Sequence, residues 1–177
     1  MAGTALTLDV GCGQNKRPGA IGIDRLPGTS ADVVADIDAG LPFVDGAFRE
    51  VSMIHVIEHV GSVVAAIEEA HRVLANGGVL RIVTPHCSDA SSFADPTHRW
   101  HLNSFSLRYF TRSGGFSYYS GSRFRRISLH VRLLRLWRML GFEFAVNRWR
   151  PFRKFWEYYL CFVVRGKVLT FELEALK

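Results

Sequence analysis

The stretch Leu8-Asp9-Val10-Gly11-Cys12-Gly13-Gln14-Asn15 decides the fold. An apolar run over residues 5–10 ends in an acidic residue and two glycines, and Ile21-Gly22-Ile23-Asp24 follows about ten residues later. This pattern predicts two short neighbouring strands that end at the same edge of a sheet. Such edges are where α/β sheets bind nucleoside cofactors.

Short apolar runs bounded by turn residues continue through the first half of the chain. They predict strands at residues 5–10, 20–24, 32–37, 51–55 and 78–84. Between the last two strands, apolar residues recur at helical spacing over 63–74, and Asn76-Gly77-Gly78 ends that helix. Strand–helix–strand alternation of this kind predicts a parallel, doubly wound α/β sheet.

The connection between the first two strands is unusually short. It spans about ten residues and contains Pro18 and Gly19, whereas a full crossover between parallel strands takes a dozen residues or more. We therefore expect the first crossover helix to be short or absent.

The second half of the chain is harder to interpret. We expect a helix near Ser104–Thr111, an aromatic helix over 152–163 and a closing strand over 168–173. The basic and apolar stretch 124–136 is separated by Gly141-Phe142 from the run 144–146, which suggests two paired strands.

The glycine turn excludes two common nucleotide-binding motifs. A phosphate-binding loop of the GxxxxGK[ST] type is absent, and Lys16 occupies the third glycine position of the dinucleotide motif. Asp24 also follows Gly13 by only eleven residues. A nucleoside without phosphates fits better, since Gly11 and Gly13 let the backbone approach a ligand closely. Asp24 is then placed to bind ribose hydroxyls, and Asp36, at the end of the third strand, to bind an adenine amino group.

Further motifs follow the first in order, at Ala35-Asp36-Ile37, Leu41-Pro42-Phe43, His55-Val56-Ile57-Glu58-His59-Val60 and Gly77-Gly78-Val79-Leu80. With this series, which covers residues 5–85, the chain resembles the class I S-adenosylmethionine-dependent methyltransferases, in their small methyltransferase-11-like branch. The resemblance implies a mostly parallel, seven-stranded Rossmann-like sheet with an antiparallel C-terminal strand. It also implies S-adenosyl-L-methionine as the cofactor.

The resemblance assigns cofactor-binding roles to residues at the expected strand ends. These are Asp9, Gly11 and Gly13 beside the methionine part, Asp24 at the ribose, Asp36 and Ile37 at the adenine, and His55 on the methionine side.

Histidines that follow the expected fifth strand are the candidates for catalysis. Methyl transfer needs a base only when the acceptor atom carries a proton, and histidine suits that role near neutral pH. His86 comes directly after the strand, and His98 lies in a segment able to fold over the pocket. The alternative is that both histidines only hold structure through hydrogen bonds.

A metal site is a further alternative. His55, Glu58 and His59 have the spacing that aligns side chains on one helix face, and with His86 they offer ligands for a divalent ion. Because His55 is expected to precede the helix, we expect no metal ligands here.

The charge distribution and the cysteine content limit which partners and which cellular compartment are expected. Residues 1–100 carry a net charge of −5 and residues 101–177 a net charge of +11, so the second half attracts an anion or is simply a solvated basic face. Three distant cysteines without a CxxC pair indicate reduced thiols and a cytoplasmic protein. No apolar run approaches the roughly 20 residues of a membrane span.

These observations combine into one expected function. We expect a single domain over 1–177, with a cofactor-binding half at 1–85 and an acceptor-binding half at 86–177. The expected reaction is methylation of a small-molecule or glycan-like acceptor, with oxygen favoured over nitrogen. The alternatives are an RNA or other nucleic-acid methyltransferase that uses the basic half, and a non-catalytic binding module that retains the fold.

Overall fold

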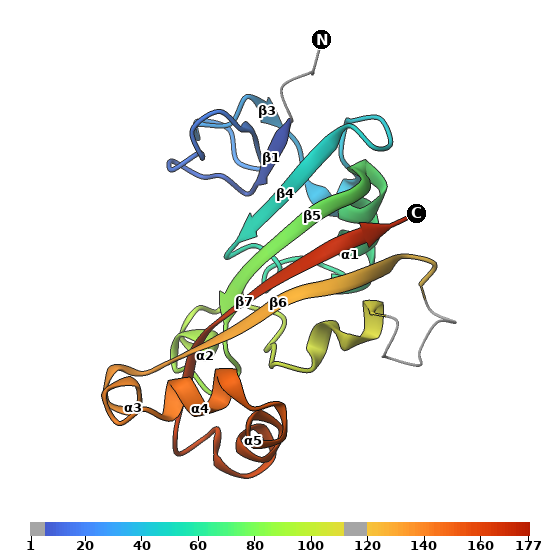
Figure 1. Cartoon of the computed structure of the whole chain (residues 1–177). Helices are drawn as coiled ribbons and strands as arrows, with labels where there is room; N and C mark the ends of the chain where they lie inside the picture. The colour runs from blue at the N-terminus through green and yellow to red at the C-terminus, as the bar shows by residue number, and fades with distance from the viewer. Residues whose placement is uncertain (1–5, 112–119) are drawn as a thin grey trace.

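Seven strands form one mixed sheet in the order β3-β2-β1-β4-β5-β7-β6 (Figure 1). The computed structural model describes residues 6–111 and 120–177. The strands are β1 (Thr7–Val10), β2 (Ile21–Asp24), β3 (Val33–Val34), β4 (Phe48–Ile54), β5 (Leu74–Pro85), β6 (Arg123–Leu133) and β7 (Gly166–Leu176).

The sheet has the expected direction of strands. β1 to β5 pair in parallel, while β7 lies between β5 and β6 and runs antiparallel to both. The seven-stranded, mostly parallel sheet with an antiparallel last strand is therefore confirmed. The chain moves outward from β1 to β3 and then returns to place β4 on the other side of β1, which creates a crevice at the carboxyl ends of β1 and β4.

The first connection contains no helix. Residues 11–20 form turns, which the side chain of Asp9 holds by accepting a hydrogen bond from the Arg17 backbone N–H at 2.9 Å. β3 is shorter than the expected 32–37, because Asp36 leaves the sheet to cap the 3₁₀ turn η1 (Ile37–Ala39). Its Oδ1 accepts from the Asp38 N–H at 3.0 Å.

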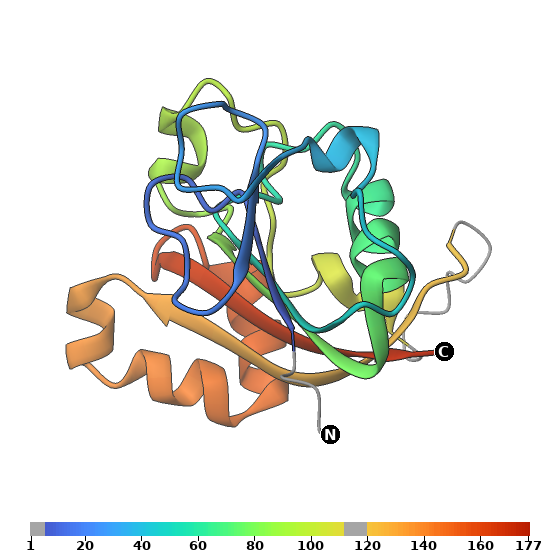
Figure 2. The same cartoon turned by 90° about the horizontal axis from the view of Figure 1, so that it is seen from above.

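Helix α1 (Val63–Val73) covers one face of the sheet, as Figure 2 shows. Its first turn is capped by Ser62, and it buries an apolar stripe of Ala66, Ile67, Ala70 and Val73. β5 begins directly after it at Leu74, four residues before the expected start.

Three expectations for the second half need correction. The run 144–146 is not a strand but lies in α4 (Phe142–Arg148), and β6 pairs with β7 instead. Gly141, at φ 78°, turns the chain into this helix. The helix expected near 104–111 is the 3₁₀ helix η2 (Ser106–Phe110), and the helix expected over 152–163 is α5 (Arg150–Phe155) followed by one π-helical turn, η3 (Trp156–Leu160).

The remaining helices are short: α2 (Ser91–Ala94) follows β5, and α3 (Arg135–Met139) follows β6. α4 packs along β6, the edge strand, and supplies side-chain partners to its backbone. Asn147 bonds both the N–H and the C=O of Val131 at 2.8 Å, and Glu143 accepts from the Leu133 N–H. In the described part of the chain, no helix combines the length and apolar character needed to cross a membrane.

Candidate functional site

A cavity of about 230 Å³ opens at the carboxyl ends of β1, β2 and β4. Five of the seven residues predicted to bind the cofactor line it: Gly11, Asp24, Asp36, Ile37 and His55. The other two support its wall. Asp9 is 4% exposed and holds the turn after β1, and the Gly13 N–H donates to Asp24 Oδ2 at 2.9 Å.

Gly11 is required by both the backbone and its surroundings. Its φ of 63° lies in the left-handed region, and an added Cβ would stand 2.5 Å from Cγ2 of Val56. Gly13 has a φ of 50° but faces open space. Gly11 therefore lets the backbone and Val56 approach each other at the cavity wall.

The two carboxylates of the cavity are fixed by backbone donors. Asp24 accepts from the N–H groups of Gly13 and Leu26, both at 2.9 Å, while Asp36 caps η1. A carboxylate oxygen can accept more than one hydrogen bond. Both side chains are thus oriented in advance and keep acceptor capacity for a ligand.

His55 stands at the end of β4 in an unusual backbone conformation. Its φ of 57° is the only positive value of a non-glycine residue in residues 6–111 and 120–177, and such positions concentrate at functional sites. Its Nδ1 lies 3.0 Å from Oε1 of the buried Glu58. The hydrogen bond to Glu58 raises the pKa of His55, against the opposing effect of burial.

A second cavity adjoins the first and shares His55 and His59 with it. Its other walls come from the end of β5 and from the segment 91–98, including Ser91, Asp95 and His98. Residues of both expected halves, 1–85 and 86–177, line each cavity. Thr97 of the second half lines the first cavity, and His55 of the first half lines the second cavity. A ligand in one cavity lies next to a ligand in the other.

His98 faces the second cavity, with 8% of its side chain exposed. Its Nδ1 lies 3.0 Å from the Ser92 carbonyl oxygen, and its ring meets that of His59 edge-on at 4.6 Å between centroids. Of the two predicted catalytic histidines, His98 is the one that lines one of these two cavities.

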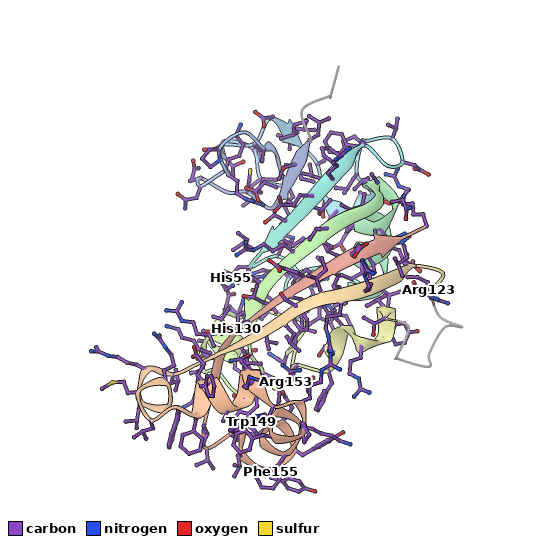
Figure 3. The ribbon with its side chains drawn as sticks, in the orientation of Figure 1. His55, Arg123, His130, Trp149, Arg153 and Phe155 are labelled. Carbon is purple, nitrogen blue, oxygen red and sulfur yellow. The ribbon has the colours of Figure 1, made fainter. Side chains whose placement is uncertain are left out.

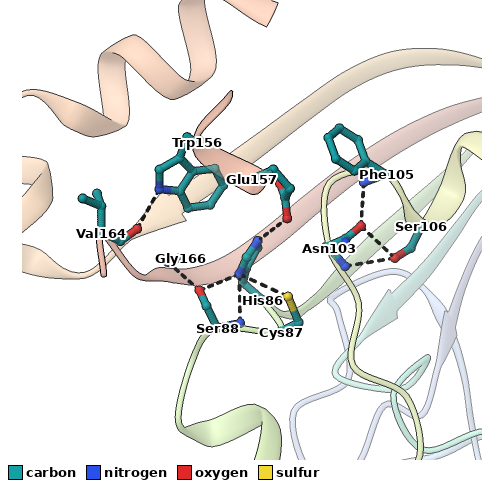
Figure 4. A network of polar contacts seen from close by, with 10 residues as sticks. All are labelled: His86, Cys87, Ser88, Asn103, Phe105, Ser106, Trp156, Glu157, Val164 and Gly166. Carbon is teal, nitrogen blue, oxygen red and sulfur yellow. Dashed lines mark hydrogen bonds and ion pairs between the residues drawn. The ribbon is translucent and has the colours of Figure 1, made fainter. Parts of the chain in front are cut away.

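His86 is fully buried and lines neither of these cavities. Figure 4 shows its ring between Ser88 and Glu157: Nδ1 accepts from the Ser88 N–H at 3.0 Å, and Nε2 lies 2.9 Å from Glu157 Oε1. An added Cβ on Gly166 would stand 2.6 Å from the His86 ring. The structure thus uses His86 to join the end of β5 to the start of β7, and it keeps this residue apart from the His55-Glu58-His59 group.

Two residues of the site had no role assigned from the sequence, and a third, His59, had been considered only as an alternative metal ligand. Val56 packs on Gly11, Thr97 lines the first cavity, and His59 lines both. Val56 and His59 lie inside the quoted motif His55-Val56-Ile57-Glu58-His59-Val60, and Thr97 lies in the stretch Asp95-Pro96-Thr97-His98 beside the predicted His98. The repeated pairing of histidine with an acidic residue in both motifs was the available signal.

Comparisons with known proteins place these features in context. A family model described as a methyltransferase domain matches residues 18–82. The crystal structure of an S-adenosylmethionine-dependent methyltransferase from Archaeoglobus fulgidus is 15% identical, with a TM-score of 0.65 over 97% of this chain and 86% of that chain. One from Mesorhizobium loti is 14% identical, with a TM-score of 0.58 over 97% and 91%.

The same fold also serves other chemistry. The crystal structure of a cyclase is 19% identical to this chain, with a TM-score of 0.61 over 98% of this chain and 75% of that chain. At these identities the likeness shows the fold alone. No curated protein matches the chain.

Proposed function

We propose that this chain is an S-adenosylmethionine-dependent methyltransferase that methylates a hydroxyl group of a small-molecule or glycan-like acceptor; the methyltransferase-domain match over residues 18–82 supports this. The methyltransferase-domain match and the cavity at the carboxyl ends of β1, β2 and β4 favour methyl transfer with S-adenosylmethionine as cofactor over a non-catalytic binding module. The identity of the acceptor is our proposal, and the polar groups of Ser91, Asp95 and His98 in the second cavity, beside the cofactor cavity, carry it.

The residues of the first cavity fit the cofactor. Asp24 would bind the ribose, Asp36 and Ile37 the adenine, and His55 the methionine side, with Asp9, Gly11 and Gly13 supporting the turn between them. The close approach of Gly11 to Val56 supports this assignment, because a side chain there would fill the wall. S-adenosylmethionine supplies a methyl group on a positively charged sulfur.

The acceptor would occupy the second cavity. Ser91, Asp95 and His98 offer hydrogen-bonding groups there that suit an acceptor with several hydroxyls. The chain's contribution is then to align the acceptor and exclude water. His98 is the residue we assign to activation of the hydroxyl, whereas the buried position of His86 favours a structural role.

Cofactor binding is tested by calorimetry with S-adenosylhomocysteine. We expect Asp24→Ala to weaken binding by about tenfold or more, since hydrogen bonds to a charged group contribute about 1.5–3 kcal/mol. Glu68→Gln, on α1 outside the cavity, is the matched control and should bind as the unaltered protein does. Absence of binding at millimolar concentration would overturn the assignment.

Acceptor choice is tested by following release of S-adenosylhomocysteine with mono- and oligosaccharides, their amino analogues and short RNAs. We expect turnover with hydroxylated acceptors, and we expect His98→Ala to reduce turnover while leaving S-adenosylhomocysteine binding unchanged. Turnover confined to amines would argue for N-methylation instead.

One observation supports RNA as a second candidate acceptor. Burial, together with the nearby Arg150 and Arg108, lowers the pKa of Arg126. Burial, together with the nearby Arg126 and Arg150, lowers the pKa of Arg153. Such crowded arginines are stabilised by a bound anion. Binding of single-stranded RNA that weakens steeply with salt would favour this candidate, and absence of binding at low salt would remove it.

We also propose a cytoplasmic location. The three cysteines, Cys12, Cys87 and Cys161, are free thiols. Free thiols are usual in a reducing compartment, so they support this location.

A further inference from the structure

Three potential metal ligands meet where the two cavities join. One ligand atom from each of Glu58, His59 and His98 lies within 4.8 Å of the other two. Glu58 is 1% exposed; its Oε1 faces His55, and its Oε2 is buried without a hydrogen-bond partner among the described residues. A buried carboxylate oxygen left without a partner is costly, so a bound cation would stabilise this arrangement.

The hydrogen bonds of both histidines leave the same nitrogen available. Thr97 Oγ1 donates its proton to Asp95 Oδ1 at 2.7 Å, so it accepts from His59 Nδ1–H at 2.9 Å. The Ser92 carbonyl oxygen can only accept, so His98 Nδ1–H donates to it. In each ring Nε2 is therefore the nitrogen without a hydrogen bond to the described residues; His98 Nε2 lies 3.9 Å from Asp95 Oδ2, too far for a hydrogen bond. Donation from the other nitrogen to an oxygen is the usual support of a metal-bound histidine.

A second group, His86, Cys87 and Glu157, also brings ligand atoms together, but its histidine has no ring nitrogen available to bind an ion. His86 Nδ1 accepts from the Ser88 N–H, and Nε2 is occupied by Glu157. Neither nitrogen of His86 is free, so this group holds the fold instead of an ion.

We propose that Glu58, His59 and His98 bind a divalent first-row transition-metal ion with open coordination positions toward the second cavity. Two imidazoles and one carboxylate are the donor set that such ions accept. The role of the ion rests on the proposed function: an acceptor hydroxyl bound to it would lose its proton to water more readily. His98 would then activate the acceptor as a metal ligand.

The test is a titration of chelator-treated, dialysed protein with Zn²⁺ by calorimetry and with Co²⁺ by visible absorption. We expect one equivalent per chain and a Co²⁺ spectrum without a thiolate charge-transfer band, which excludes Cys87 as a ligand.

Thr97→Val, which removes the partner of His59 Nδ1, should weaken binding roughly 10–100-fold. His59→Ala, His98→Ala and Glu58→Gln should weaken it further. His130→Ala, at an exposed position on β6, is the matched control and should leave binding unchanged.

Folded protein that binds S-adenosylhomocysteine but neither metal would overturn the metal site and leave the proposed function standing. Metal binding that is equally strong in the His59 and His98 variants would also overturn it. Metal binding without S-adenosylhomocysteine binding would support the site and contradict the proposed function.

An independent observation concerns the helices between β6 and β7. Ten large apolar side chains of residues 136–163 are 49–75% exposed, among them Met139, Phe144, Trp149, Tyr159, Phe162 and Val163. Trp149 and Phe155 lie at the end of the molecule beyond the sheet (Figure 3). An exposed apolar surface of this extent marks an interaction site.

The net positive charge of these helices indicates that the partner covering the apolar surface is anionic. The helices also expose Arg135, Arg138, Arg148, Arg150 and Lys154. The two acidic residues of the segment are engaged: Glu143 accepts from the Leu133 N–H, and Glu157 is buried beside His86. Aromatic and basic residues in this combination are typical of surfaces that lie on anionic membranes.

We infer that α3, α4, α5 and η3 dock on an anionic lipid bilayer. β6 runs parallel to β5, because both are antiparallel to β7. The helices after β6 therefore start from the sheet edge that carries the two cavities. Docking would bring the cavities close to the lipid surface.

Sedimentation with phosphatidylglycerol-containing vesicles tests this inference. We expect binding that is lost on pure phosphatidylcholine, and a decrease of about tenfold or more when Tyr159→Ser is combined with Phe162→Ser. The paired variant should keep its circular dichroism spectrum. Absence of binding to anionic vesicles at low salt would overturn the inference, as would a dimer in solution that the paired variant converts to monomer.

Discussion

At the scale of single residues, the site depends on two positions where we expect the presence or absence of a side chain to decide whether the cofactor can bind. Gly11 and His55 both have positive φ, and both line the cofactor cavity. Gly11 needs the absence of a side chain, whereas His55 is held by its bond to Glu58 and by its backbone N–H, which donates to Val83 O at 2.8 Å. The strained backbone of His55 thus lies at the cavity wall, and Gly11 adopts its positive φ there without strain.

Gly11→Ala should weaken binding of S-adenosylhomocysteine. The new Cβ would meet Val56 Cγ2 at 2.5 Å and would adopt a left-handed conformation that costs about 1–2 kcal/mol. Calorimetry should show a loss of about tenfold. Adding Val56→Ala removes the clash but not the backbone strain, so the double variant should recover part of the affinity. No recovery would show that the contact with Val56 is not the cause.

Protonation of His71 on α1 should make the fold sensitive to acid. Burial lowers the pKa of His71, whose Nε2–H donates to the Leu176 carbonyl at 3.1 Å and whose ring meets Phe124. Because the unfolded chain binds this proton more readily, stability is complete above about pH 6.5 and falls as the pH drops below that value.

The His71→Gln variant tests this sensitivity, since an amide can still donate to Leu176 but does not titrate. Urea unfolding at pH 7 and at about pH 5.5 should show a smaller loss of stability for the variant than for the unaltered protein. His130→Gln, at an exposed position, should behave as the unaltered protein does. An equal loss in all three proteins would contradict the assignment.

At the scale of elements, α4 protects the open edge of the sheet. Asn147 bonds the N–H and C=O of the buried Val131, and it also donates to Glu143 O at 2.8 Å. An edge strand with unpaired backbone groups invites pairing with another chain. The helix therefore replaces the missing neighbour strand of β6 with side chains.

Asn147→Ala should destabilise the protein by about 1–3 kcal/mol, because two buried backbone groups lose their partners. Urea unfolding measures the loss, and light scattering should detect association through the exposed edge. Asn147→Asp keeps the acceptor for the Val131 N–H but loses the donor, so its stability should fall between the two. Unchanged stability of the alanine variant would show that water replaces the side chain fully.

At the scale of the whole molecule, ligand binding should raise thermal stability. A ligand at 100 times its dissociation constant stabilises the folded state by about 2.7 kcal/mol. For a chain of this size that corresponds to an increase in Tm of roughly 5–10 °C. Scanning fluorimetry with S-adenosylhomocysteine measures it. Asp24→Ala at the same ligand concentration should show a much smaller increase, and an equal increase would place the ligand elsewhere.

Local patterns predicted the elements whose partners lie near in sequence. The strands at 5–10, 20–24 and 51–55 and the helix at 63–74 were identified because apolar spacing and turn residues agree there. The run 144–146 fits a short strand and a helix equally well, and its packing on β6 decided for the helix. A contact distant in sequence also determined the position of His86, since Glu157 holds it in the interior. The position of His98 at the cavity is determined locally, by the carbonyl of Ser92 six residues earlier.

The place of β7 in the sheet has a consequence for synthesis. Residues 166–176 form hydrogen bonds with β5 on one side and β6 on the other. Until residue 176 has left the ribosome, β5 is therefore paired only with β4, and β6 has no partner strand. Until then the nascent chain exposes two unpaired edges and the apolar helices between them. Such chains fold slowly and aggregate readily. We therefore expect this protein to depend on chaperones during translation more than a fold with sequential strand order would.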